Sequence, residues 1–451
     1  MAEPLTRLGL ASTAFFRSER AGSSHSILTM VLLEGPCDID ALRDAIAAQL
    51  DATPLLRSRV VNDGGPIWKR WAWCADAQPV APRVTDLRAI PGCDDLAGVV
   101  DHIYDRGRRA RNLSLEQPAR VTVALLDDDR TVLALERHHA AADATVTYGF
   151  VRDALARYHR SATGTDPSWA DIPVIHSRAG PSPRAAASRA DLVRYSRVLQ
   201  QTYPGEDVAF FAGTPSPHGE QITVRAPRID LDTTSALRRR ARAADGSTIT
   251  DLAVVAAMRA LHAWNSEKGA SALVQRHSLP VAQRQASSTT EPNALSLITV
   301  GCRSDELAER AELLLSVSRQ RADALGAGID IALARVLGRL TPLSGLDLCA
   351  RLAGLTAESA GRAVSCITTN PGILWPETVD GRLTGDSALT EVGDLRVMDT
   401  LSIFNGLGGS LRLTTFRSEL RLDFAANTEI MSRQEATEIS QLIHGELLGF
   451  L

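Results

Sequence analysis

Lysine is almost missing from this chain of 451 residues, in which Lys69 and Lys268 are the only two examples among 49 basic residues. Arginine therefore supplies nearly all of the positive charge, and we interpret this bias as a product of genomic base composition. Acidic residues slightly outnumber basic ones, which gives a net charge of −4. This balance argues against a protein that binds nucleic acid.

Closely spaced cysteines are also missing: the six cysteines are widely scattered, and none belongs to a CxxC pair. This spacing argues against a zinc site. A chain of this length does not need a disulfide framework, so we expect reduced thiols and a cytoplasmic protein. No apolar run reaches the length of a transmembrane segment, and the N-terminal apolar stretch lacks the charged start and cleavage site of a signal peptide.

The length predicts two domains, because 451 residues exceed what one core usually covers and 44% of them are hydrophobic. Proline, glycine and serine interrupt the middle of the chain and predict a linker or crossing segment. We therefore expect an N-terminal subdomain at 1–177, the crossing segment at 178–219 and a C-terminal subdomain at 220–451. Near the C-terminus, three expected strands would form a β-meander of the second half: 395–404, 410–416 and 419–424.

The most informative feature is the sequence RHHAAADA, in which His138 and His139 precede Asp143. The apolar segments within 121–135 flank a polar turn and predict a β-hairpin that leads directly to these histidines. Asp143 is expected to cap an amphipathic helix over 145–160. An imidazole at the end of a strand suits proton abstraction, because histidine titrates near neutral pH.

Two other interpretations of this motif remain open. His138 and His139 can be ordinary residues at the end of a strand, since a pattern this short also arises by chance. A metal site is the second alternative, but adjacent residues on an extended backbone point to opposite faces and would not easily share one ion. No other cluster at ligand spacing lies nearby in the sequence, so we expect no metal.

The histidine motif resembles the HHxxxDG signature of the chloramphenicol acetyltransferase-like superfamily, which includes nonribosomal-peptide condensation domains and polyketide-associated acyltransferases. Weaker resemblances follow in the same order along the chain: 53–57 resembles HPxLR, 247–257 an alanine-rich helix start, and 279–284 the PVxxR strand end. Ala144 departs from the family glycine. The DFGWG motif of plant enzymes is absent where Asn405 precedes a glycine-rich stretch, which fits the bacterial stand-alone members better.

The resemblance implies an α/β (α+β) fold of two chloramphenicol acetyltransferase-like subdomains, each a mixed sheet covered by helices, in a V shape with a central tunnel. It implies that His139 is the general base and that His138 supports the loop. The family aspartate pairs with an arginine instead of the base, which implies an architectural tie between Asp143 and Arg284. Ala144 is expected to preserve the tight loop because alanine is the smallest replacement for glycine.

The resemblance also implies substrate contacts from Thr369 and Asn370, at a strand end that faces the tunnel, and from Asn405. A plain turn is the alternative for 366–372, because Asn-Pro-Gly is a strong turn signal. The alternative for Arg284 is a surface arginine, since this chain has many.

The implied function is that of an acyltransferase for groups other than aminoacyl groups. It would move an acyl group from a thioester donor, acyl-CoA or the phosphopantetheine of an acyl carrier protein, to a hydroxyl or amine of a secondary metabolite, polyketide or glycolipid. We expect no permanently bound cofactor, a small-molecule acceptor as the other partner, and a monomer. Two alternatives remain: a free-standing nonribosomal-peptide-type condensation enzyme that forms an amide or ester, and a catalytically silent relative that binds a metabolite or carrier protein.

Overall fold

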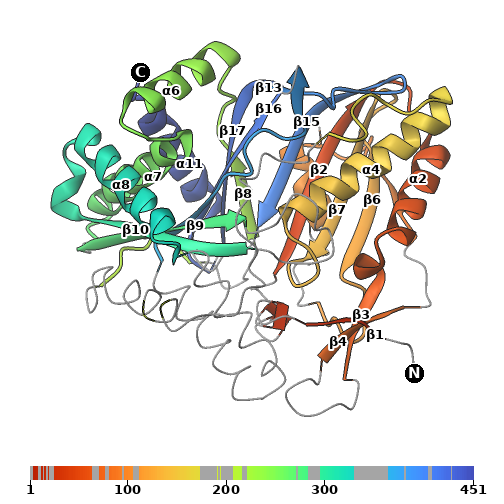
Figure 1. Cartoon of the computed structure of the whole chain (residues 1–451), viewed down its shortest axis with the longest axis horizontal. Helices are drawn as coiled ribbons and strands as arrows, with labels where there is room; N and C mark the ends of the chain where they lie inside the picture. The colour runs from red at the N-terminus through yellow and green to blue at the C-terminus, as the bar shows by residue number, and fades with distance from the viewer. Residues whose placement is uncertain are drawn as a thin grey trace.

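Two six-stranded sheets lie side by side in the computed structural model, and helices cover both of them (Figure 1). Among the described residues, no helix is both long enough and apolar enough to cross a membrane. The structure describes residues 4–8, 12–13, 15–16, 19, 25–62, 71–76, 81–93, 96–104, 111–172, 190, 193, 207–215, 221–270, 273–282, 295–329, 364–379, 382–404, 409–427 and 429–451.

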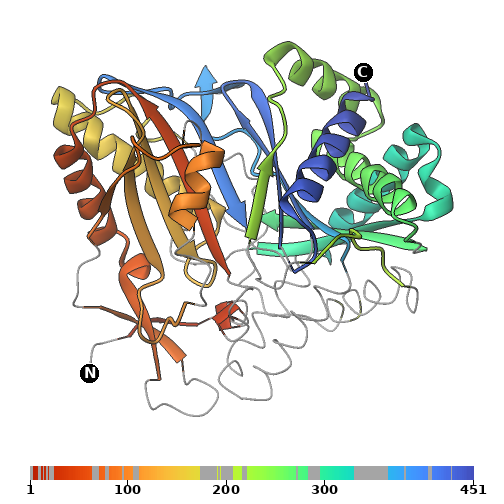
Figure 2. The ribbon, with the colours of Figure 1, turned by 180° about the vertical axis from the view of Figure 1, so that it is seen from behind.

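The first sheet is antiparallel except for its β5–β6 edge. In spatial order its strands are β14 (Glu391–Val392), β15 (Leu395–Phe404), β2 (Ser26–Glu34), β7 (Arg130–His138), β6 (Ala119–Leu125) and β5 (Arg83–Asp86). Its two faces are covered by different helices, as the views from the front and from behind show (Figures 1 and 2). The helices of the front face are α2 (Ile39–Asp51) and α4 (Ala144–Thr163), and the helix of the back face is α3 (Leu96–Tyr104).

Strand β2 shows why this sheet needs helices on both faces. Val31 and Leu33 belong to the core formed with α2 and α4, whereas Leu28 and Met30 belong to the core formed with α3. Alternate side chains of a strand point to opposite faces. A strand that is apolar at every position therefore has to be buried on both sides, as the apolar run of this segment predicts.

The second sheet is mixed, because its short central strand β11 runs parallel to both neighbours. In spatial order its strands are β10 (Leu295–Arg303), β9 (Val274–Ala282), β11 (Cys366–Thr369), β16 (Gly409–Phe416), β17 (Glu419–Asn427) and β8 (Gln221–Arg225). One large core joins this sheet to four helices: α6 (Leu231–Ala243), α7 (Ile249–Glu267), α8 (Arg310–Gly326) and α11 (Arg433–Leu448). The expectation of two mixed sheets covered by helices is thus confirmed.

Smaller elements complete the described part of the chain. A three-stranded sheet contains β1 (Pro4–Arg7), β4 (Trp71–Ala75) and β3 (Ser58–Asn62), in that order. The remaining elements are a ribbon of β12 (Pro376–Val379) and β13 (Arg382–Ser387) and two 3-10 helices, η1 (Pro54–Arg57) and η4 (Ser304–Leu307).

The predicted β-meander is wrong in its first strand. Strands β16 and β17 pair with each other, but β15 crosses to the first sheet and pairs with β2. The reason is burial on both faces: Val397 joins the core of α2 and α4, and Leu401 and Ile403 join the core of α3. The predicted C-terminal subdomain 220–451 therefore contributes two strands, β14 and β15, to the first sheet.

Ion pairs hold β15 against the second sheet. Asp399 follows an irregularity in the pairing of β15 with β2, and its carboxylate lies 2.8 Å from Arg225 of β8 and 3.3 Å from Arg421 of β17. Arg225 also contacts Asp423 of β17 at 2.7 Å. The two halves of the molecule are thus connected through a buried network of charges as well as through the backbone.

Candidate active site

The histidine motif occupies the end of β7 and the turn that leads into α4. His138 is the last residue of β7 and lies opposite Ser26 of β2. The backbone N–H of Ala141 then donates to the carbonyl of His138 at 3.0 Å. Asp143 ends the turn as the N-cap of α4, where its carboxylate accepts the N–H of Val146 at 3.1 Å. The predicted order of hairpin, histidines and capped helix is confirmed.

The imidazole of His138 is held in one neutral form. Its Nδ1 accepts the backbone N–H of Ala140 at 3.0 Å and therefore carries no proton. Its Nε2 lies 3.1 Å from the carboxylate of Glu19 and must donate the remaining proton to it. Burial lowers the pKa of His138, which keeps the ring neutral although Glu19 acts in the opposite direction. No lone pair of His138 is left to accept a proton from a substrate.

Glu19 holds three parts of the chain around this histidine. Besides His138, its carboxylate accepts the backbone N–H of His25 at 2.6 Å and that of Arg111 at 2.9 Å. Burial alone would raise the pKa of Glu19, but these hydrogen bonds outweigh it and lower the pKa to about 2. Sequence reasoning missed Glu19, because nothing distinguishes it locally from the other acidic residues of the chain.

His139 lies in a different environment from its neighbour. Its backbone N–H donates to the carbonyl of His25 at 2.8 Å, and its ring stacks on Phe15 with centroids 4.3 Å apart and planes 12° apart. The side chain of His138 is fully buried, whereas His139 keeps 8% of its surface exposed. Of the two histidines, only His139 keeps part of its surface exposed to solvent. Among the described residues, no group of three or more His, Cys, Asp or Glu side chains could hold a metal ion.

Arg137 lies on the face of β7 opposite to that of His138, next to the first turn of α4. It is fully buried and donates to the hydroxyl of Thr147 and to the carbonyl of Ala142. Burial lowers the pKa of Arg137 to about 9, and the nearby charge of Asp143 acts in the opposite direction. Asp143 is thus a helix cap that lies close enough to the buried Arg137 to favour its positive charge. The predicted tie from Asp143 to Arg284 lies outside the described residues.

The predicted substrate residues of the second half are only partly described. The side chain of Asn370 accepts the N–H of Gly372 at 2.7 Å and donates to Thr250 of α7 at 2.9 Å. These bonds are typical of a turn that is tied to a helix, the plain alternative for this segment. A substrate contact from Thr369 stays a prediction, and Asn405 lies outside the described residues.

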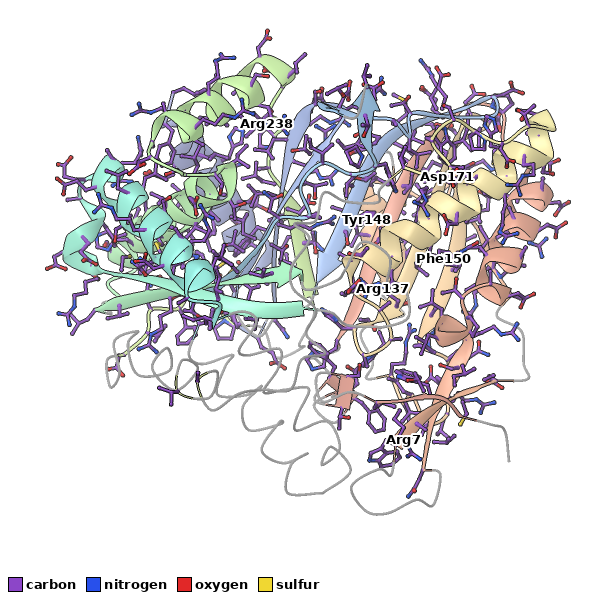
Figure 3. All side chains as sticks on the ribbon, viewed as in Figure 1. Arg7, Arg137, Tyr148, Phe150, Asp171 and Arg238 are labelled. Carbon is purple, nitrogen blue, oxygen red and sulfur yellow. The ribbon has the colours of Figure 1, made fainter. Side chains whose placement is uncertain are left out.

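Two residues that sequence reasoning did not single out join the halves beside the motif. Arg412 of β16 donates through Nη2 to the hydroxyl oxygen of Tyr148 on α4, and both side chains are buried. Trp375 fixes this part of α4 further, because its indole N–H donates to the carbonyl of Tyr148 at 3.1 Å. Figure 3 places Tyr148 and Arg137 where the two sheets meet.

The likeness of the chain to known proteins lies in its fold. No family model matches the chain. The chain is 28% identical over 239 residues to phosphinothricin tripeptide synthetase PhsC of Streptomyces viridochromogenes. The match covers 52% of this chain and 22% of that synthetase, so the chain spans less than a quarter of the curated relative's length.

Three solved structures share the fold over almost the whole chain. The first condensation domain of the calcium-dependent antibiotic synthetase, in complex with a substrate analogue, aligns with a TM-score of 0.68 and 16% identity over 99% of this chain and 96% of that one. The starter condensation domain of rhizomide synthetase, in complex with C8-CoA, aligns with a TM-score of 0.64 and 13% identity over 98% of this chain and 93% of that one. The TRI3 trichothecene 15-O-acetyltransferase of Fusarium sporotrichioides aligns with a TM-score of 0.67 and 12% identity over 99% of this chain and 95% of that one.

These likenesses define the class of protein to which the fold belongs. The chain has the condensation-domain fold, which consists of two chloramphenicol acetyltransferase-like halves. This is the fold that the resemblance of the histidine motif predicted.

Proposed function

We propose that the protein is an acyltransferase of the condensation-domain type and that His139 is its general base. The observation that carries this proposal is the contrast between the two histidines. Hydrogen bonds to Ala140 and Glu19 occupy both ring nitrogens of His138, whereas His139 lies at the same turn with 8% of its surface exposed. A general base needs a side chain that the substrate can contact, and of the two histidines only His139 keeps part of its surface exposed.

The reaction follows from these roles. The hydroxyl or amine of the acceptor attacks the thioester carbonyl while His139 removes its proton. The C–S bond then breaks, and the protonated imidazole returns the proton to the departing thiolate. The donor would be acyl-CoA or an acylated phosphopantetheine on a carrier protein, both of which would reach His139 through a tunnel between the halves. The complex of the rhizomide starter domain with C8-CoA supports a thioester of this kind.

A second candidate is condensation of two units into an amide or ester. The identity with a segment of a tripeptide synthetase favours it, because the printed name of that relative describes peptide assembly. The same base serves both reactions, and the acceptor distinguishes them: an alcohol that is not carrier-bound indicates acyl transfer, whereas an aminoacyl thioester indicates condensation. A silent relative would release no thiol with either.

Thiol release from a panel of acyl-CoA and acyl-phosphopantetheine donors, offered with alcohol and aminoacyl-thioester acceptors, tests the proposal. We expect His139→Ala to lower kcat by at least about 100-fold, the usual contribution of a general base. His262→Ala is the matched control, because His262 is exposed on α7. Turnover near the wild-type rate in His139→Ala would remove this residue from the mechanism.

A further inference from the structure

Strand β16 presents polar side chains to the interface between the two halves. Leu411 and Leu413 belong to the core of the second half, so the alternate residues Ser410, Arg412 and Thr414 face the other way. Ala425, which pairs with Ser410, belongs to the α3 core of the first half. This face of the second sheet therefore looks toward the first half, and it is buried although it is polar.

Arg412 is the buried cation of this face, and Asp423 of β17 lies opposite it in the strand pairing. Only 9% of its surface is exposed, its one described hydrogen bond goes to the neutral hydroxyl of Tyr148, and its Nη1 is buried without a hydrogen-bond partner among the described residues. Burial lowers the pKa of Arg412 to about 10, which still leaves the guanidinium charged near neutral pH. A buried N–H of a charged group that lacks an acceptor is costly to the folded state.

The hydroxyl of Tyr148 adds a second donor at the same place. Its oxygen accepts the N–H of Arg412, so its own proton has to point elsewhere, and no described residue accepts it. The indole of Trp375 holds the backbone of Tyr148, with the two rings edge to face at 5.7 Å. Thr369 of β11 lies beside Arg412 in parallel register, on the same face of the sheet.

The surrounding charge also favours an anion. Arg412 lies close enough to Arg137 to lower the pKa of Arg137, which is the repulsion expected of two buried cations. Asp423, which also pairs with Arg225, is the negative charge that favours the charged form of Arg412. Two donors without acceptors among the described residues, beside a second buried cation, form a site where an anion can bind, although Asp423 already offsets part of the charge of Arg412.

We propose that Arg412 and Tyr148 bind a compact oxyanion of a substrate, a carboxylate or a phosphate, between the two halves of the molecule. The site lies beside the turn that carries His139, so the inference rests on the proposed function in identifying the ligand as a substrate. The two sources of such a group are the carboxylate of an acidic acceptor and the phosphate of a phosphopantetheine donor. Guanidinium groups recognise both through charge-assisted hydrogen bonds.

Calorimetric titration of the full chain with two matched pairs of unreactive probes tests the site. The phosphate pair is 4′-phosphopantetheine and pantetheine, and the carboxylate pair is N-acetylglycine and its amide. We expect the anionic member of one pair to bind at least about 10-fold more tightly than its neutral partner, as a hydrogen bond to a charged group predicts. The pair that shows this preference identifies the source of the anion.

Three variants separate the site from general effects of mutation. Arg412→Met should abolish the preference for the anion, and Tyr148→Phe, which removes a single oxygen atom, should reduce it several-fold. Arg238→Met is the matched control, because Arg238 also donates to β16, at Thr415, on the opposite face of the sheet. If Arg412→Met does not fold, Tyr148→Phe decides alone.

Equal affinity within both pairs overturns the inference, and so does a preference that survives in Arg412→Met or stays unchanged in Tyr148→Phe. Failure of the proposed function looks different. In that case no donor releases thiol through His139, but an anion preference that depends on Arg412 persists. Conversely, thiol release that needs His139, without any anion preference, contradicts only the Arg412 site.

Discussion

Glu19 accepts a hydrogen bond of 3.1 Å from His138, although the two residues lie 119 positions apart in the chain. The same carboxylate accepts the N–H of His25, whose carbonyl in turn accepts the N–H of His139. Glu19 therefore positions both histidines: it fixes the tautomer of His138 directly and the backbone of His139 through His25. Second-layer contacts of this kind determine how precisely a base is oriented.

The first prediction concerns Glu19→Gln. The amide supplies one acceptor oxygen and a donor group where the protein presents three N–H donors, so at least one of them loses its acceptor. We expect the free energy of unfolding to fall by about 1–3 kcal/mol and kcat to fall more than KM rises. Urea denaturation and steady-state kinetics measure both. Glu438→Gln on the exposed surface of α11 should change neither, and a Glu19→Gln enzyme with wild-type kcat would contradict the positioning role.

The second prediction concerns Asp143→Ala. Loss of the cap of α4 costs about 1 kcal/mol, and Arg137 loses the nearby negative charge that offsets its burial. We therefore expect the melting temperature to fall at least as clearly as activity. Asp230→Ala is the matched control, because Asp230 caps α6 in the same way at the surface. A stable but inactive Asp143→Ala protein would instead favour a direct catalytic role for the carboxylate.

The predicted tie between Asp143 and Arg284 has its own test. Arg284→Ala should resemble Asp143→Ala, and the double variant should lose less stability than the sum of the two single losses, because partners in one contact are coupled. Additive losses in a thermal melt would show that the two residues act independently.

The third prediction concerns the contact between Arg225 and Asp399. Removal of one partner leaves the other charge in a largely buried place, which costs about 3–5 kcal/mol. We expect Arg225→Met and Asp399→Asn to lower the free energy of unfolding by amounts of this order, and the double variant to lose less than their sum. Arg88→Met breaks an exposed pair with Asp86 and should lower the free energy of unfolding far less. Equal losses at both sites would contradict the importance of the buried network.

The fourth prediction concerns pH and His277 of β9. This histidine is fully buried, neither ring nitrogen has a hydrogen-bond partner in the part of the chain that the structure describes, and burial lowers its pKa to about 3. The unfolded chain binds this proton near pH 6.5 and the folded protein only near pH 3, so the unfolded state gains the proton first as the pH falls. Stability should therefore decrease from pH 6.5 downward, by roughly 2–3 kcal/mol at pH 4.5.

Thermal melts of wild type and His277→Leu across this interval measure that contribution. The leucine variant should lose less stability than wild type between pH 6.5 and 4.5, whereas His262→Leu, at an exposed position of α7, should follow wild type. Parallel pH profiles of wild type and His277→Leu would mean that His277 takes up its proton without cost in the folded protein.

Local patterns allowed the end of the first sheet that carries the two histidines to be predicted. A polar turn between apolar runs predicts β6 and β7, and an aspartate before an amphipathic segment predicts the cap of α4. Each of these sequence signals lies within a few residues of the strand or helix that it predicts. The partners of these elements are set by tertiary packing. Glu19 and Arg412 reach His138 and Tyr148 only after distant segments have met, and the sequence around each of them carries no sign of that meeting.

The placement of β15 shows the same limit for the fold. Its apolar positions predict a strand, but adjacency along the chain favours pairing with β16, and only the cover that α2, α4 and α3 provide decides otherwise. A pattern of hydrophobic residues specifies that a strand is buried on both faces, whereas the choice between two sheets depends on which one offers such a place.

The position of β15 also has a consequence for biosynthesis. While the chain emerges from the ribosome, β2 has no neighbour on one side until residue 404 of 451 has been made. The open edge of a nascent sheet invites association with other chains. A fragment that ends at residue 177 should therefore aggregate when it is produced alone, and a peptide that carries 391–404, supplied during refolding, should keep it soluble.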